Sequence, residues 1–469
     1  MLLGRHGPLD PQGIRISGAR IIGGLTLDNL VAGVGLKLVG CVFEERISAW
    51  NARLPWLDLS RSRLPGFQAS LSEIDAGLWM TGAVISGSAS DSLVGLSGAR
   101  IRGQFDLGEA RITNKSGAAV RAVGLDVGGN VLMSGAKLRG AGSRGAVQLF
   151  GAHIGGSLVM SRARIANRSG KALTAAQLRI DGSLMCEGVK ASGDDFGGVI
   201  SLIGARVAGD ASFLEAEFIT RSGLALDLEH AQVTGKIFLV RAALCSGPEA
   251  DVACEDPTLV DLNGFAFGAL ESSPGRAVSW REWLHLVRYH TESYRPGPYQ
   301  ALANAERGAG HDGNARRILI AQQKDIRRRA PEALGNWLTR RFHWLWGVLA
   351  GYGYLTRRTA VALLFVLMAS GGLGVWAGRV TDGGHHVGER VSSFTSPYGH
   401  LCTTVELVGL GLDRGLPLAP TGVRARCDLN PDTNWASVFT VLIWLLQAAI
   451  WGLATLALAG YTGLVRKPT

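Results

Sequence analysis

A repeat with a period of 26 or 27 residues runs through the first half of the sequence. It appears as columns of similar residues that recur at the same alternating steps. The clearest column is aliphatic and consists of Ile101, Val127, Ile154, Ile180, Val207 and Val233. Two residues further along each unit lies a column of glycines: Gly103, Gly129, Gly156, Gly182, Gly209 and Gly235. A fixed period of this length predicts stacked structural units.

Each unit has the alternation of a β-strand. From Ala99 to Leu107, every second residue is small or apolar and the residues between are polar, so the two sets face opposite sides of a strand. The units are too short for a strand and a full crossover helix. Residues 1–247 are therefore predicted to be mainly β, a parallel β-helix of about nine coils of 26–27 residues. A second glycine column predicts turns with positive φ: Gly117, Gly145, Gly170, Gly198 and Gly223.

One line of outward-facing positions in the repeat is unusually apolar. Its apolar members are Leu132, Val159, Met185 and Phe238. Scattered surface hydrophobes are normal in soluble proteins. A continuous strip of them instead predicts a surface covered by a partner, a second copy or the chain's own helices.

The N-terminal residues lack the long apolar segment of a secretory signal, so we expect the β-helix to lie in the cytosol. In that reducing compartment, cysteines are expected to be core thiols rather than disulfides. This expectation concerns Cys41, Cys186, Cys245 and Cys254.

Residues 248–335 are predicted to form a linker that caps the repeat domain. The stretch from Val260 to Phe267 is a candidate last strand, and Ser279 is a candidate helix N-cap. Pro296-Gly297-Pro298 is expected to break the chain. The residues that follow predict a helical hairpin that covers the open end of the β-helix.

The C-terminal part has the pattern of a membrane module. Residues 359–378 and 435–464 carry no charge and are long enough to cross a bilayer. Residues 336–358 are rich in aromatic residues and predict an interfacial helix. Basic residues flank the outer ends of the two spans, whereas the loop 379–434 has five Arg and six acidic residues. The positive-inside rule therefore predicts a multi-pass protein of the cell membrane with both termini in the cytosol.

The net charge of +10 is concentrated next to the first span, because residues 316–358 contain ten Arg or Lys and two acids. Such a run is also found in nucleic-acid-binding proteins. Beside a membrane span it favours the anionic lipids of the inner leaflet, so no nucleic-acid partner is predicted. The candidate lipid contacts are Arg340, Arg341, Arg357 and Arg358.

The loop 379–434 holds a candidate disulfide, Cys402–Cys427, because its side of the membrane can be oxidising. His385, His386 and His400 have no carboxylate or cysteine at ligand spacing, and no metal site is predicted. Thr403-Thr404-Val405 and Gly409-Leu410-Gly411 resemble the filter loop of a two-helix channel. In that family the valine and the first glycine are adjacent, whereas here three residues intervene. The alternative is an amphipathic segment on the outer leaflet.

Signals of catalysis are weak. Gly140 to Gly145 matches the G-x-G-x-x-G dinucleotide fingerprint, but the residues that follow predict a strand rather than a helix. Asp194-Asp195 resembles the acid clusters of β-helix polysaccharide lyases, yet it lies in a predicted turn and no export signal is seen. We therefore predict no catalytic residue and no cofactor.

The repeat Gly98-Ala99-Arg100-Ile101-Arg102-Gly103, its later copies, and the segment from Tyr299 to Ala321 resemble actinobacterial membrane-anchored proteins with pentapeptide-like β-helix repeats. The likeness covers nearly the whole chain and implies architecture more than activity. Such chains are sometimes labelled membrane-associated oxidoreductase, and the resemblance implies that activity as an alternative.

The sequence as a whole predicts a non-enzymatic integral membrane protein whose cytosolic β-helix is a scaffold or an interaction surface. Its expected partners are membrane lipids and an unknown protein or a second copy. The alternatives are a membrane-associated oxidoreductase and a two-helix oligomeric channel or membrane effector.

Overall fold

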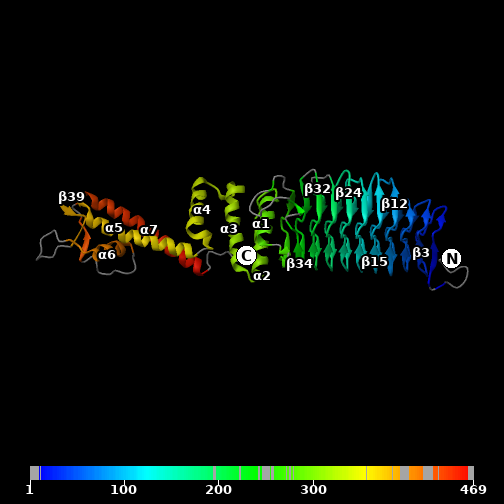
Figure 1. Cartoon of the computed structure of the whole chain (residues 1–469), viewed down its shortest axis with the longest axis horizontal. Helices are drawn as coiled ribbons and strands as arrows, with labels where there is room; N and C mark the ends of the chain where they lie inside the picture. The colour runs from blue at the N-terminus through cyan, green and yellow to red at the C-terminus, as the bar shows by residue number, and fades with distance from the viewer. Residues whose placement is uncertain are drawn as a thin grey trace. The chain divides into compact units, whose positions relative to one another are not determined.

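The computed structural model describes residues 10, 12–193, 197–220, 223–240, 243–245, 254, 258–270, 272–273, 276–277, 279–354, 356–382, 384–390, 401–415, 426–430 and 433–462. The contacts divide the chain into two compact units, Met1–Asp325 and Ile326–Thr469. The first unit contains a parallel β-solenoid of about eight turns, which is followed by helices (Figure 1).

Short parallel strands form the sides of the solenoid, and each strand pairs with its counterparts one coil away. One face is a sheet of nine described strands: β2 (Arg20–Ile21), β4 (Val42–Phe43), β8 (Arg63–Leu64), β12 (Val84–Gly87), β16 (Arg111–Asn114), β20 (Lys137–Gly140), β24 (Arg164–Asn167), β28 (Lys190–Gly193) and β32 (Glu217–Thr220). A second sheet also has nine described strands: β5 (Ile47–Ser48), β9 (Phe67–Gln68), β13 (Ser92–Gly95), β17 (Ala118–Arg121), β21 (Val147–Gln148), β25 (Leu173–Thr174), β29 (Ile200–Ser201), β33 (Leu224–Asp227) and β35 (Leu259–Asp261).

The third sheet is larger because most coils contribute two strands to it. Its 18 described strands are β1 (Ile14–Ser17), β3 (Leu36–Val39), β6 (Arg53–Leu54), β7 (Leu57–Asp58), β10 (Glu73–Ile74), β11 (Gly77–Trp79), β14 (Arg100–Ile101), β15 (Gln104–Asp106), β18 (Asp126–Val127), β19 (Val131–Leu132), β22 (His153–Ile154), β23 (Leu158–Val159), β26 (Arg179–Ile180), β27 (Leu184–Met185), β30 (Arg206–Val207), β31 (Ala211–Ser212), β34 (Gln232–Phe238) and β36 (Ala266–Leu270).

The predicted columns are pairing partners in this third sheet. Ile101 pairs with Val127, and Val127 with Ile154. The pairing then continues without a shift to Val233. These side chains are at most 6% exposed and fill the interior of the solenoid. Burying one such aliphatic side chain contributes roughly 1.5–3 kcal/mol, so the repeated column holds the coils together. The β-solenoid is therefore confirmed.

The predicted coil count and coil length are wrong for the first coils. Ile14 pairs with Leu36, Leu36 with Leu57, and Leu57 with Leu78, which are steps of 22, 21 and 21 residues. The next step, from Leu78 to Phe105, has 27 residues. The longer coils have an extended corner, since four residues separate β12 from β13 whereas two separate β8 from β9. The solenoid has about eight turns, whereas about nine were predicted.

The predicted strand Ala99–Leu107 is split in two. β14 ends at Ile101 and β15 begins at Gln104, with a bend between them at the glycine column. The solenoid also extends beyond residue 247, because β35 pairs with β33 and β36 pairs with β34. The candidate strand from Val260 to Phe267 thus belongs to two strands of the last turn.

Three helices follow the solenoid: α1 (Trp280–Tyr289), α2 (Pro296–Gly308) and α3 (Asp312–Arg329). The Ser279 hydroxyl accepts a hydrogen bond from the Glu282 N–H, which confirms the predicted N-cap of α1. Pro296 begins α2 rather than breaking the chain. Proline is favoured at the first helical position because an N–H there would have no hydrogen-bond partner within the helix, so its absence costs nothing.

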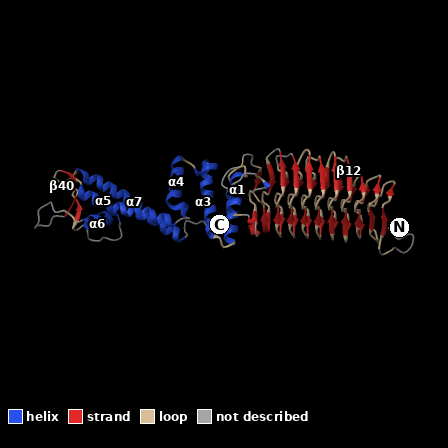
Figure 2. Cartoon of the chain, in the orientation of Figure 1, coloured by secondary structure: helices blue, strands red, loops and turns tan. Residues whose placement is uncertain are grey.

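The second unit is largely helical, in contrast to the first (Figure 2). Its helices are η2 (Pro331–Leu334), α4 (Trp337–Ala350), η3 (Gly351–Gly353), α5 (Thr356–Arg379), α6 (Thr404–Gly415) and α7 (Asn434–Thr462). Two antiparallel strand pairs are also described: β39 (Thr381–Asp382) with β40 (His385–His386), and β41 (Gly388–Arg390) with β42 (Cys427–Leu429). Helix α6 packs closely against α5, where the Ser370 hydroxyl donates to the Gly411 carbonyl at 2.7 Å.

Candidate functional site

The outward apolar positions of the repeat form one line on the solenoid, which is interrupted at Ser212. Leu132 pairs with Val159, and Val159 with Met185. Ser212 separates Met185 from Phe238 in the same register. The four apolar side chains are half-buried, and we call them the apolar strip. They are close enough to act as one surface, since paired strands lie about 4.8 Å apart.

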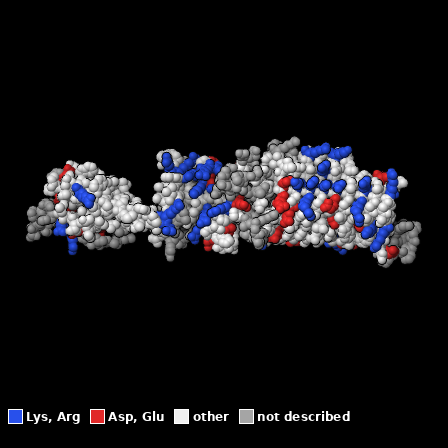
Figure 3. All heavy atoms as spheres, in the orientation of Figure 1, with Lys and Arg blue, Asp and Glu red and all other residues white. Residues whose placement is uncertain are grey.

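A basic row lies on the sheet that contains β12, β24 and β32, where Lys and Arg gather in Figure 3. Arg111, Lys137, Arg164 and Lys190 pair in register and are exposed. At its end, Lys190 forms a 2.6 Å ion pair with Glu217. We did not predict this row from the sequence, although its members recur at the repeat's own steps.

Charges of opposite sign alternate on part of the 18-stranded sheet. His153 contacts Asp126 through Nδ1 at 3.0 Å and Asp181 through Nε2 at 3.1 Å. The hydrogen bonds to Asp126 and Asp181 raise the pKa of His153. Burial alone would raise the pKa of Asp126, but the hydrogen bonds from His153 and Arg100 lower it. These are largely exposed pairs, which contribute little to stability.

The two long helices of the second unit are apolar enough and long enough to cross a membrane, over Arg357–Arg379 and Asn434–Leu458. Only 22% and 17% of their most apolar windows are buried inside the protein. Large apolar side chains point outward along both helices: Val361, Leu364, Phe365, Met368, Trp376, Trp435, Val438, Val441, Trp444, Leu445, Trp451 and Leu458.

The candidate lipid-contacting arginines are all exposed. Arg340 and Arg341 lie in α4, and Arg357 and Arg358 lie in the first turn of α5. On α4 the apolar residues Trp337, Leu338, Phe342, Trp344, Leu345 and Val348 are exposed beside the arginines. Such a mixed face is typical of a helix at a membrane surface.

In the loop between the long helices, Cys402 and Cys427 are joined in a disulfide. His385 contacts Glu389 at 3.6 Å, and His400 lies outside the described residues. The filter-like segment from Thr403 to Gly411 lies within helix α6 from Thr404 onward, and Thr403 directly precedes the helix. Its backbone carbonyls are therefore directed along a helix rather than presented as an extended filter.

The dinucleotide fingerprint lies in a corner of the solenoid. β20 ends at Gly140 and β21 begins at Val147, so a strand follows the motif where a nucleotide-binding fold has a helix. Asp194-Asp195 lies outside the described residues. Among the described free thiols, Cys41 and Cys186 are buried, and burial raises the pKa of the Cys186 thiol, which makes it unreactive.

A pocket of about 220 Å³ lies between the last solenoid turn and the following helices. Its lining includes Asp261, Asn263, Val287 and Glu292. Asp261 also lies near Asp227 and Glu229, and burial raises the pKa of Asp227. Asp227 and Asp261 accept hydrogen bonds from backbone N–H groups of their own turns, and Glu229 accepts one from the Asn263 side-chain amide, which gives the three acids a structural role.

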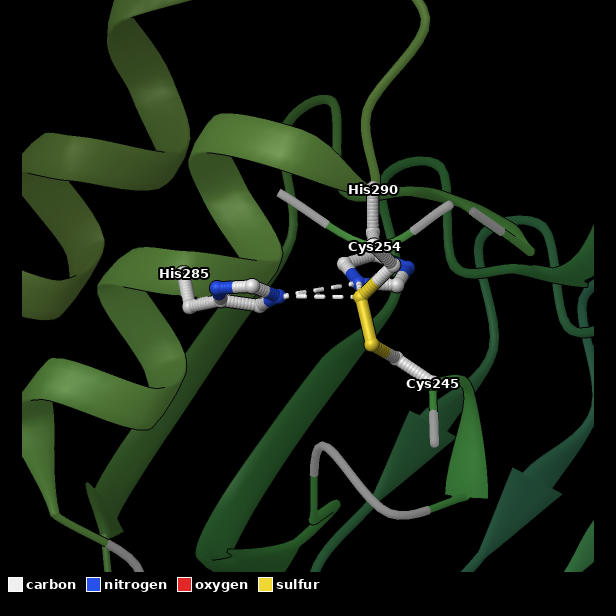
Figure 4. A group of neighbouring side chains, drawn as sticks. All are labelled: Cys245, Cys254, His285 and His290. Carbon is white, nitrogen blue, oxygen red and sulfur yellow. Dashed lines mark hydrogen bonds between the residues drawn. A yellow bond between two sulfur atoms is a disulfide. The ribbon is translucent and has the colours of Figure 1, made fainter. Parts of the chain in front are cut away.

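The densest group of potential ligands lies beside α1. Cys245 follows β34, Cys254 precedes β35, His285 lies on α1 and His290 is its C-cap. Figure 4 shows the four side chains pointing toward one another. Their ligand atoms all lie within 4.8 Å of one another. We call this group the Cys–His cluster.

Contacts within the cluster are close. The Cys254 Sγ lies 3.4 Å from the Nε2 atoms of both His285 and His290. The two Nε2 atoms are 3.2 Å apart, and both imidazoles are 0% exposed. In the structure Cys245 and Cys254 are joined in a disulfide, in contrast to the free thiols expected from the sequence.

We did not predict the Cys–His cluster from the sequence. The available signal was a pair of cysteines nine residues apart, followed by two histidines five residues apart in the predicted linker. No known family, curated protein or solved structure matches the chain. The functional inferences below therefore rest on its own residues.

Proposed function

We propose that the chain is a non-enzymatic integral membrane protein that presents a cytosolic β-solenoid as a scaffold or protein-interaction surface. The observation that supports this most directly is the outward apolar surface of α5 and α7, since little of either helix is buried in the protein. Leaving one large apolar side chain in water forgoes roughly 1.5–3 kcal/mol relative to burying it. A bilayer core removes that cost for every outward side chain at once.

The orientation follows from charge. Arg340, Arg341, Arg357 and Arg358 are expected to meet the anionic inner leaflet, with α4 lying in the interface. The disulfide Cys402–Cys427 then lies in the extracytoplasmic loop, where oxidation is possible. Both termini and the solenoid are on the cytosolic side. We further propose that α2 and α3 form a hairpin that covers the end of the solenoid.

The apolar strip is the surface where we expect a protein partner or a second copy. The test uses the full-length protein in detergent, with its mass measured by light scattering and its bound proteins recovered by pull-down. Replacing both Val159 and Met185 with Lys should reduce the mass of the assembly or release the partner. The control is Ile219→Lys, which adds one lysine at an apolar site on another face that is already 62% exposed.

Unchanged mass and unchanged binding in the double variant would contradict a role for the strip. The same preparation also tests the two alternatives. A flavin or nicotinamide absorption band at near-stoichiometric level would favour an oxidoreductase. Ion flux in liposomes that contain the purified protein would favour a channel.

A further inference from the structure

We propose that Cys245, Cys254, His285 and His290 form a structural zinc site that fastens α1 to the last turn of the solenoid. Two cysteines and two histidines are a common ligand set of tetrahedral structural zinc. The proposal concerns the protein with both cysteines reduced. Each thiol then loses one proton to the solvent as Zn²⁺ binds, and the two imidazoles bind through neutral nitrogens.

The contacts are those that a tetrahedral centre requires. With Zn–N bonds of about 2.0–2.1 Å and Zn–S bonds of about 2.3 Å, the edges of a tetrahedron are about 3.3 Å between two nitrogens and about 3.5 Å between nitrogen and sulfur. The Nε2 atoms of His285 and His290 are 3.2 Å apart, and the Cys254 Sγ is 3.4 Å from each. Three of the four ligand atoms are therefore already placed. Cys245 completes the set once its sulfur is separated from that of Cys254.

The hydrogen bonding of His290 prepares its Nε2 atom for a metal. The ring donates from Nδ1 to the Thr258 carbonyl oxygen at 2.7 Å. The Nδ1–H tautomer leaves a lone pair on Nε2, which faces the cluster (Figure 4). Metal-binding histidines are commonly fixed in this way by a backbone carbonyl.

Charge and burial also favour a metal. The Nε2 atoms of His285 and His290 face each other at 3.2 Å in a fully buried site, where they can share one hydrogen or both bind the same cation. Two thiolates balance the charge of Zn²⁺, so the complete centre is neutral. It therefore avoids the cost of an uncompensated buried charge.

The redox state of the two cysteines decides between a disulfide and a metal site. Their Cα atoms are 6.1 Å apart, a separation that permits a disulfide. In a cytosolic domain, thiols are kept reduced and cysteine pairs with nearby histidines bind metal more often than they oxidise. This step rests on the proposed cytosolic location of the solenoid. The pair Cys402–Cys427, on the opposite side of the membrane, remains a disulfide.

The experiment begins with the full-length wild-type protein, purified in detergent with a phosphine reductant and without chelators. We expect one zinc ion per chain by elemental analysis. Exchange for Co²⁺ should give the strong visible absorption of a tetrahedral site with thiolate ligands. Cys254→Ala and His285→Gln should lose the metal. The control Cys186→Ala removes a buried free thiol elsewhere in the solenoid and should keep it.

A second measurement determines the redox state of the two cysteines in the wild-type protein in cells. Cysteines 245 and 254 lie on the same tryptic peptide, residues 242–276. After alkylation in intact cells followed by denaturation in the alkylating agent, that peptide should carry two alkyl groups. The peptides that contain Cys402 and Cys427 should instead remain cross-linked.

The proposal is overturned if the wild-type protein contains no stoichiometric metal and peptide 242–276 is unalkylated and internally cross-linked. It is also overturned if Cys254→Ala folds and keeps its zinc. The location of the solenoid is measured separately by protease accessibility. A cytosolic solenoid without zinc would contradict the metal site alone, whereas a zinc-loaded solenoid outside the cell would contradict only the proposed topology.

Discussion

At the glycine column of the repeat, successive coils approach too closely for a side chain. The Gly129 N–H donates to the Gly103 carbonyl at 2.9 Å, and the Gly156 N–H donates to the Gly129 carbonyl at 2.9 Å. The same pattern continues through Gly182, Gly209 and Gly235. A Cβ atom on Gly129 would lie 2.8 Å from the Gly103 oxygen. The column is therefore glycine because backbone packs on backbone at the bend between two strands.

We expect Gly129→Ala to destabilise the solenoid by about 1–3 kcal/mol, because the atoms that its methyl group meets belong to the backbone and cannot rotate away. Thermal unfolding of the full-length protein in detergent is the measurement. The control is Gly313→Ala in helix α3, where a Cβ meets no atom within 4 Å. Alanine is the better helix former, so the control should be neutral or slightly stabilising. Equal melting temperatures for the two variants would contradict this account.

Only some glycines of the second column have the positive φ that the sequence predicted for turns. Gly145, Gly198 and Gly223 have the positive φ that was expected. Gly117 and Gly170 do not, and there the constraint is again crowding, since a Cβ on Gly170 would lie 2.6 Å from the Ser143 oxygen. A glycine in a repeated column can thus have either of two physical causes, which sequence spacing does not distinguish.

At the scale of the strand, stacking in register places equal positions of successive coils side by side. This favours apolar columns, because each side chain is buried by its neighbours. Stacking in register is unfavourable for columns of like charge, because it places them directly side by side. In the basic row, Arg164 is paired with Lys137 on one side and Lys190 on the other. Like charges on directly paired positions destabilise a sheet.

Replacing Arg164 with Gln should therefore raise the stability of the solenoid by a few tenths of a kcal/mol at low salt. The gain should shrink as salt is added, because screening weakens the repulsion between exposed charges. Melting temperatures in about 20 mM and 500 mM salt are the measurement. The matched control is Arg100→Gln, whose guanidinium contacts Asp126 at 3.1 Å, so its loss should not stabilise. A gain for Arg164→Gln that is the same at both salt concentrations would argue against repulsion.

Buried polar contacts of a different kind tie the helices of the first unit together. Asp325 of α3 is buried and accepts hydrogen bonds from Arg288 of α1 at 2.6 and 3.1 Å. The Tyr299 hydroxyl of α2 donates to the same carboxylate at 3.0 Å. Breaking such a buried pair from one side leaves an uncompensated charge. One carboxylate thus links all three helices that follow the solenoid.

At the scale of the whole molecule, the proposed topology predicts which parts an external protease can reach. Trypsin added to intact cells without an outer barrier should cut within residues 379–434, where the arginines of the extracytoplasmic loop lie. The solenoid should survive as one N-terminal fragment. After permeabilisation, the basic segment 316–358 should be cut as well. Digestion of residues 316–358 in sealed cells would contradict cytosolic termini.

The sequence alone determined the parallel solenoid, the register of its later coils and the two long apolar helices. These could be predicted because they depend on local composition or on contacts between residues one period apart. Ile101 and Val127 are partners simply because the repeat places them there.

The tertiary structure decided what depends on contacts between different elements. The position of α6 against α5 follows from the close packing of Gly374 and Gly411, which no local pattern encodes. The Cys–His cluster joins the last solenoid turn to α1, so its four ligand atoms become neighbours only after the chain has folded. The split between β14 and β15 at the glycine column likewise depends on the close approach of neighbouring coils, and in the last column position β34 runs through Gly235 without a split.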